Sequence, residues 1–95
     1  MDEIKKKHIL AAIKEIDNQG IRSGRHSSTY DLIYDGKPYP PKLVISIANR
    51  YATGEELDPN TFAGGIGTSS FQLLEKEGFK IINKEIKNTK YPRSR

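Results

Sequence analysis

The stretch from Ala63 to Ser70, AGGIGTSS, places three glycines and three hydroxyl side chains directly before an apolar, helix-like segment. Glycine gives the backbone freedom, and a helix N-terminus exposes N–H groups that suit a phosphate oxygen. Gly67, Thr68 and Ser69 are therefore candidate phosphate contacts. The competing explanation is a tight turn for close helix packing, in which Ser69 only caps the helix and Gln72 completes a capping box.

Two common nucleotide-binding loops do not fit this stretch. A Walker loop requires a lysine before its serine or threonine, and GGIGTSS contains none. A dinucleotide fingerprint requires a third glycine and a preceding parallel strand, whereas the preceding DPNTF is not typical of a strand. We therefore expect no nucleotide cofactor.

The side chains that usually carry catalysis are scarce. The chain has no cysteine, and its two histidines, His8 and His26, do not have metal-ligand spacing. Asp31 and Asp35 fall on a predicted hairpin, where acids usually face solvent. We expect no catalytic residue, no metal and no cofactor, and hence a protein that is not an enzyme.

Basic residues next to aromatic or small residues suggest a nucleic-acid contact instead. Lys37 and Lys42 flank the sequence PYPP, which contains Tyr39, and such a group can follow a phosphate backbone. Arg22 and Arg25 lie in a polar loop that could enter a groove. All of them could equally be ordinary solvent-exposed residues. The candidate nucleic-acid contacts are Arg22, Arg25, Lys37, Tyr39, Lys42, Gly67, Thr68 and Ser69.

The elements that must position these residues can be read from periodicity and turn signals. A first helix, which Asp2 could cap, precedes a hairpin in which Asp35-Gly36 predicts a type I′ turn. A second helix starts near Pro41 and a third runs from about Ser69, before a final strand around residues 79–83. The order predicts a single small α+β domain over residues 1–83, helix–β-hairpin–helix–helix–strand, loosely like a winged helix. Residues 84–95 read as a basic flexible tail or linker.

Composition and charge narrow the class of protein. The chain has 95 residues, 35% of them hydrophobic, and a formal net charge of +4. Residues 1–78 carry ten lysines and arginines against eleven acids, whereas residues 79–95 carry six against one, so the basic character is concentrated at the C-terminal end. No apolar run approaches the roughly 20 residues of a membrane span. We expect a cytoplasmic protein with no membrane partner.

A family resemblance rests on the stretch YDLIYDGKPYPPKLVISIANRYATGEELDPNTFAGGIGTSSFQLLEKEGFKI, more than half of the chain. It resembles the small N-terminal domain that precedes McrB-like GTPase subunits and McrA-like HNH endonucleases, which are modification-dependent restriction proteins. The resemblance implies a DNA-sensing or head module without the GTPase or nuclease. The matching positions are Lys37, Tyr39, Lys42, Phe62, Gly64, Gly65 and Gly78.

Two functions follow as expectations. The first is a non-enzymatic DNA-binding module of a restriction and phage-defence system, which contacts the phosphate backbone of modified or unmodified duplex DNA. The alternative is a protein–protein docking module with no direct nucleic-acid contact, whose partner would be a nuclease or motor subunit or domain. A basic face would favour the first function, and an exposed apolar patch would favour the second.

Overall fold

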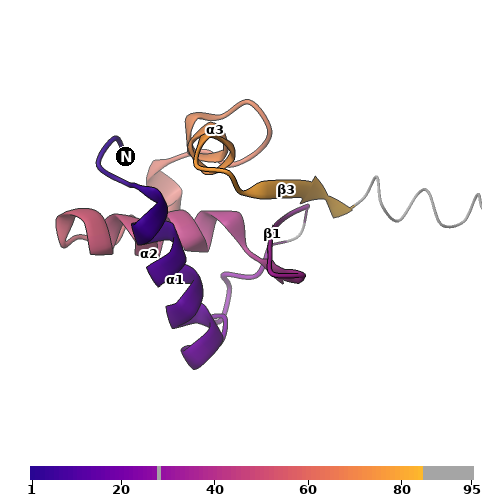
Figure 1. Ribbon diagram of the computed structural model, residues 1–95, viewed down its shortest axis with the longest axis horizontal. Helices are drawn as coiled ribbons and strands as arrows, with labels where there is room; N and C mark the ends of the chain where they lie inside the picture. The colour runs from indigo at the N-terminus through magenta and orange to yellow at the C-terminus, as the bar shows by residue number, and fades with distance from the viewer. Residues whose placement is uncertain (28, 85–95) are drawn as a thin grey trace, which may run out of the picture.

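Three α-helices and a small antiparallel sheet make up the computed structural model, which describes residues 1–27 and 29–84 (Figure 1). The elements follow the predicted order, and the α+β class is confirmed. Their bounds are α1 Lys6–Gln19, β1 Tyr30–Tyr34, β2 Lys37–Tyr39, α2 Pro41–Thr53, the 3-10 helix η1 Pro59–Thr61, α3 Ser69–Lys76 and β3 Lys80–Asn83.

The sheet has the strand order β2-β1-β3, with both pairings antiparallel. Leu32 in the central strand lies opposite Tyr39 on one side and Ile81 on the other. Asp35 and Gly36 have φ values of 53° and 76°, as both central residues of a type I′ turn require. The predicted hairpin turn is therefore confirmed, and it fixes the register of β2.

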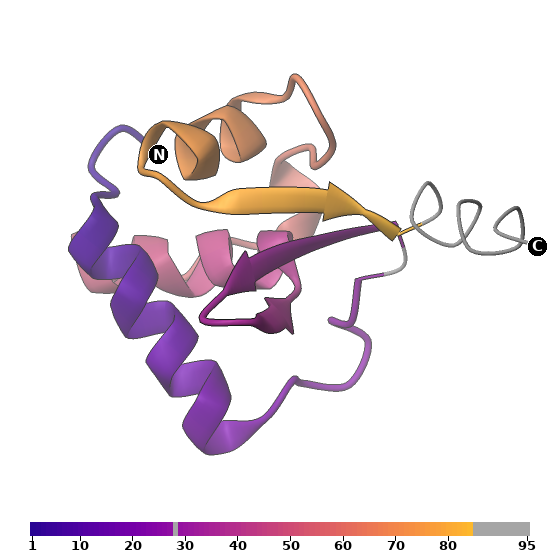
Figure 2. The same cartoon turned by 45° about the vertical axis from the view of Figure 1, so that its right-hand side comes forward.

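The hydrophobic core lies where α1 crosses α2 and where α2 and α3 meet the sheet (Figure 2). Helical spacing places one apolar stripe of α1 and of α3 toward this core, whereas α2 is buried on nearly all sides from Leu43 to Asn49. Its buried members are Ile4, Ile9, Ala12, Ile13, Ile16, Leu32, Tyr39, Leu43, Val44, Ile45, Ile47, Ala48, Phe71, Leu74 and Phe79. No helix among the described residues has the length and apolarity to cross a membrane.

The first helix begins at Lys6, so the prediction that Asp2 caps it is wrong. Ile4 is buried in the core, and its N–H donates to the carbonyl of Met1, which makes the first residues a separate turn. The backbone N–H of Lys5 donates to Nδ1 of His8 at 2.9 Å. His8 thus occupies the position that Glu or Gln takes in a capping box.

The chain continues past β3 with a described residue, Lys84. Its backbone N–H donates to the carbonyl of Thr29 at 2.8 Å, and its ammonium donates to the carbonyl of Ser27 at 3.0 Å. The ammonium also lies 3.7 Å from Asp31. Of the predicted tail or linker over residues 84–95, residues 85–95 lie outside the described part of the chain, so that prediction stands as made.

Candidate functional site

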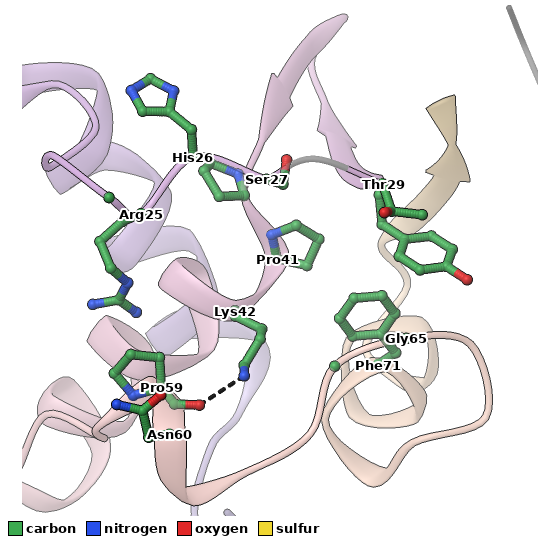
Figure 3. Close-up of a pocket in the computed structure, with 14 residues that line it drawn as sticks. Arg25, His26, Ser27, Thr29, Pro41, Lys42, Pro59, Asn60, Gly65 and Phe71 are labelled. Carbon is green, nitrogen blue, oxygen red and sulfur yellow. Dashed lines mark hydrogen bonds between the residues drawn. The ribbon is translucent and has the colours of Figure 1, made fainter. Parts of the chain in front are cut away.

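A pocket of about 530 Å³ opens where three segments meet: the loop before β1, the start of α2, and the stretch from η1 to the glycines (Figure 3). Arg25, His26 and Lys42 contribute basic side chains. No aspartate or glutamate is found among the described residues that line it. Its other walls are rings, small polar groups and backbone: Ser27, Thr29, Tyr30, Pro40, Pro41, Pro59, Asn60, Gly64, Gly65, Phe71 and Gly24.

Lys42 is held in position at the floor of this pocket. Its ammonium donates to the carbonyl of Pro59 at 2.7 Å (Figure 3). It also lies 4.8 Å from the centre of the Phe62 ring. A Cβ on Gly64 would come within 2.9 Å of Lys42 Cδ, so only glycine permits this close approach. An ammonium has three donors, and the bond to Pro59 leaves two for a ligand.

Arg25 reaches the pocket from the opposite segment. Its Nη2 donates to the hydroxyl of Ser46 at 3.0 Å, and Ser46 is fully buried on α2. No carboxylate in the described part of the chain forms an ion pair with Arg25. A guanidinium has five donors, so most of its hydrogen-bonding capacity remains for a bound group.

Arg22, three residues before Arg25, belongs to a different environment. Its guanidinium makes two hydrogen bonds to the carboxylate of Glu56 and lies 3.6 Å from Glu15. Arg50 Nη2 contacts Glu15 at 2.5 Å, and the hydroxyl of Tyr51 donates to Glu15 at 2.8 Å. The bond from Arg50 lowers the pKa of Glu15, and the bond from Arg22 lowers that of Glu56. Two arginines and two glutamates thus neutralise one another.

Tyr39 and Lys37 lie away from the pocket. The side chain of Tyr39 is only 4% exposed, and its hydroxyl donates to Asp17 at 2.7 Å. Burial, reinforced by this bond, raises the pKa of Tyr39 to about 12. Lys37 is exposed on β2 beside a second hollow of about 300 Å³ between the end of α1 and β2. The structure therefore does not bring Lys37 and Tyr39 together with Lys42.

The glycine stretch forms a turn beside the pocket. The N–H of Thr68 donates to the carbonyl of Gly65 at 3.2 Å, and Gly65 and Gly67 have φ values of 119° and 90°. Thr68 is the residue before α3, and Ser69 is the first residue of the helix, so the predicted Ser69–Gln72 capping box is wrong. Gly65 lines the pocket, whereas Gly67, Thr68 and Ser69 do not.

Several pocket residues were not among the sequence candidates. His26 and Asn60 add polar groups, and Tyr30 and Phe71 form an edge-to-face pair with ring centres 5.3 Å apart. In Figure 3 the His26 side chain points away from Lys42. Tyr30 and Phe71 lie 41 positions apart in the sequence and meet only through packing of α3 on the sheet, so no local pattern marks them.

The fold and pocket define a small α+β module, and comparison with known families makes its relationship specific. The model described as "ScoMcrA-like, N-terminal head domain" matches residues 2–83. The chain therefore belongs to this family of head domains. The predicted relationship to the N-terminal domains of McrA-like restriction proteins is confirmed.

A further similarity concerns a much longer protein. The chain is 30% identical over 76 residues to 1-deoxy-D-xylulose-5-phosphate synthase of Aquifex aeolicus (strain VF5). The aligned part covers 78% of this chain but 11% of the synthase, so the similarity is to a small part of that protein. No solved structure matches the chain.

Proposed function

We propose that this chain is the non-enzymatic DNA-binding module of a restriction system, and that Arg25 and Lys42 hold a phosphate of duplex DNA in the pocket between them. The observation that carries this proposal is the convergence of two cations from different elements on one pocket with no acidic lining residue. Membership of the head-domain family supports the restriction-system context.

The chemistry of the two side chains suits a phosphate diester. A guanidinium presents a planar fork of donors to two phosphate oxygens, and an ammonium adds a compact point charge. Lys42 also lies in the first turn of α2, where free N–H groups and the helix dipole add positive potential. These contributions act on the same pocket because Pro40, Pro41 and Lys42 all line it.

The remaining walls suit the sugar and the edge of a base. Tyr30, Phe71 and the prolines offer apolar surface, while Asn60 and the backbone of Gly64 and Gly65 offer polar groups. Phosphate contacts of this kind position a protein on the duplex without reading its sequence. The proposed activity is therefore backbone binding, which the parent protein would combine with a nuclease or motor domain.

The test is the salt dependence of binding to a short labelled duplex, measured by fluorescence anisotropy. The variant Arg25→Gln/Lys42→Gln removes both proposed contacts. The control Lys37→Gln/Lys80→Gln removes the same charge from exposed positions on β2 and β3, outside the pocket. Melting curves confirm that each variant is folded.

We expect the pocket variant to bind at least about tenfold more weakly at low salt, with a slope of log affinity against log salt reduced by about 1, as the loss of one neutralised phosphate implies. The control should stay within about threefold of the original chain, since it loses only diffuse attraction. Equal losses of affinity in both variants would contradict the proposal that the pocket holds a phosphate. No binding at about 50 mM salt by the original chain would favour the docking function instead.

A further inference from the structure

Ile66 is the most exposed large hydrophobic side chain of the described residues. It is 59% exposed, compared with 46% for Tyr51 and 39% for Tyr34. Tyr51 has a partner in Glu15, and the Tyr34 ring lies 5.9 Å from that of Phe79. Ile66 is not among the hydrophobic residues of the core or those packed against it, and burying such a side chain against a partner is favourable.

The backbone that presents Ile66 is fixed. Ile66 and Gly67 are the central residues of a turn closed by the hydrogen bond from Thr68 N–H to Gly65 O. The φ of 90° at Gly67 is the one that a type II turn requires at this position. The hydroxyl of Thr68 also donates to Gly65 O, at 2.6 Å, so the turn is held by two bonds to one carbonyl.

A buried serine fastens the base of the same loop. Ser70 is fully buried, and its hydroxyl donates to the carbonyl of Ala63 at 2.7 Å. The loop that runs between η1 and α3 stands out from the body of the molecule (Figure 2). Ile66 is therefore held outward on a braced turn, and little conformational entropy would be lost when it binds.

The location of this turn indicates its partner. Gly64 and Gly65, immediately before Ile66, line the basic pocket, and Gly65 lies against the Tyr30 ring. The twelve residues from Thr61 to Gln72 contain no charged side chain, so the turn itself does not repel phosphate. An apolar tip thus follows directly on the wall of a pocket lined by two cations that have no acidic partner among the described residues. This combination matches the base stack and backbone of a duplex better than it matches a wholly apolar protein surface.

We propose that Ile66 is a wedge that enters a groove of duplex DNA and opens a base step, while Arg25 and Lys42 hold the neighbouring phosphate. Isoleucine is among the side chains that partly unstack bases and kink the duplex in this way. Pyrimidine–purine steps such as TA deform most easily and should be the preferred point of entry. This inference rests on the proposed DNA binding and adds the residue that deforms the duplex.

The experiment uses the full chain and a duplex with a central TA step and a fluorophore pair at its ends. Energy transfer reports bending, and anisotropy of the same duplex reports binding. The variants are Ile66→Ser, which removes the wedge, and Ile66→Leu, which keeps an apolar side chain. Because Ile66 is exposed, both variants should melt as the original chain does.

We expect the original chain and Ile66→Leu to raise energy transfer on binding. Ile66→Ser should lose that rise and bind about fivefold more weakly, with the salt slope unchanged because the phosphate contacts remain. Salt-dependent binding by the original chain without a rise in energy transfer, or an unchanged rise with Ile66→Ser, would overturn the wedge and leave the phosphate pocket standing. Absence of salt-dependent binding would overturn both.

Discussion

Arg22 and Arg25 lie three residues apart in one loop, yet they belong to two regions with opposite electrostatic character. Arg22 joins Arg50, Glu15 and Glu56 in a cluster whose charges cancel. Arg25 bonds to a neutral serine and lines a pocket without acids. Whether a surface cation is available to bind a ligand therefore depends on the carboxylates that the fold brings to it. Only an uncompensated cation can offer its charge to a ligand.

The neutralised cluster contributes to stability because it joins four segments. Glu15 comes from α1, Arg22 from the following loop, Arg50 from α2 and Glu56 from the segment after α2. The side chain of Glu15 is 11% exposed, so its carboxylate depends on these partners for most of its polar contacts. The arginines are more exposed, and solvent screening reduces the energy of each pair.

The largest effect on stability should come from removing the carboxylate at the centre of the cluster. Glu15→Gln leaves Arg50 and Tyr51 with a neutral acceptor, and we expect it to lower the free energy of unfolding by about 1–2 kcal/mol. Urea denaturation measures this, with Glu75→Gln, an exposed position on α3, as the matched loss of one acid. Equal effects of the two substitutions would show that the cluster does not stabilise the fold.

The same cluster predicts the response to acid. Glu15 and Glu56 have pKa values lowered below 4.5 in the folded chain, so their contribution to stability is present above that pH and is lost as the pH falls through the lowered values. The urea midpoint should therefore fall below about pH 4.5 in the original chain, and less so in Glu15→Gln/Glu56→Gln. Parallel pH profiles of the two proteins would argue against ion pairing as the cause.

The buried tyrosine gives a smaller effect at the opposite end of the pH scale. Tyr39→Phe removes the bond to Asp17, and we expect a loss of about 1 kcal/mol. Because the folded pKa of Tyr39 is raised to about 12, the neutral phenol stabilises the fold below pH 10, and that stability is lost as the pH rises toward 12. The variant should lack this alkaline loss and bind DNA as the original chain does. Weakened DNA binding by Tyr39→Phe would show that Tyr39 contributes to the DNA-binding site after all.

The contrast between the two arginines can be tested directly by removing the acid that neutralises Arg22. Glu56→Gln leaves Arg22 with one carboxylate partner, at 3.6 Å, and we expect DNA affinity to rise about twofold to threefold at low salt. Glu55→Gln is the matched control, since it removes the same charge at the neighbouring exposed position. A similar rise in both variants would attribute the change to net charge alone.

The smallest effect on DNA binding should come from Gly64→Ala. Gly64 does not have a positive φ, so alanine fits the backbone. The alanine Cβ would, however, lie 2.9 Å from Lys42 Cδ and would displace that side chain. We expect DNA binding to weaken about twofold, with a melting temperature close to that of the original chain. In a Lys42→Gln background the same substitution should have no further effect, because both changes act on one contact. Additive losses of DNA affinity would show that Gly64 and Lys42 act on different contacts.

Much of the fold could be predicted because its signals are local. Asp35-Gly36 specifies the hairpin turn, and the apolar spacing of α1 marks its buried face. One error concerns Asp31, which was expected to face solvent but has a side chain only 13% exposed. The other errors are at helix starts. Asp2 resembles a cap, but burial of Ile4 forces a separate turn before the helix, and Thr68 rather than Ser69 precedes α3.

The candidate site could be predicted only in part, because long-range contacts determine which of the candidate residues reach the pocket. Lys42 and Arg25 were among the candidates and meet at the pocket. Tyr39 has the same local sequence signal, but its pairing with Leu32 turns its side chain into the core. Arg22 is neutralised by Glu56, 34 positions away, and no local pattern reveals such a partner.

The most direct test of the account compares the arginine side chains within one unmodified protein. Side-chain Nε–H resonances of Arg22, Arg25 and Arg50 can be followed by NMR while a duplex is added at low salt. We expect the Arg25 signal to shift and to become protected from solvent exchange, while those of Arg22 and Arg50 stay in place. Shifts of Arg22 and Arg50 with an unchanged Arg25 would contradict it, because the neutralised cluster would then be the surface that binds DNA.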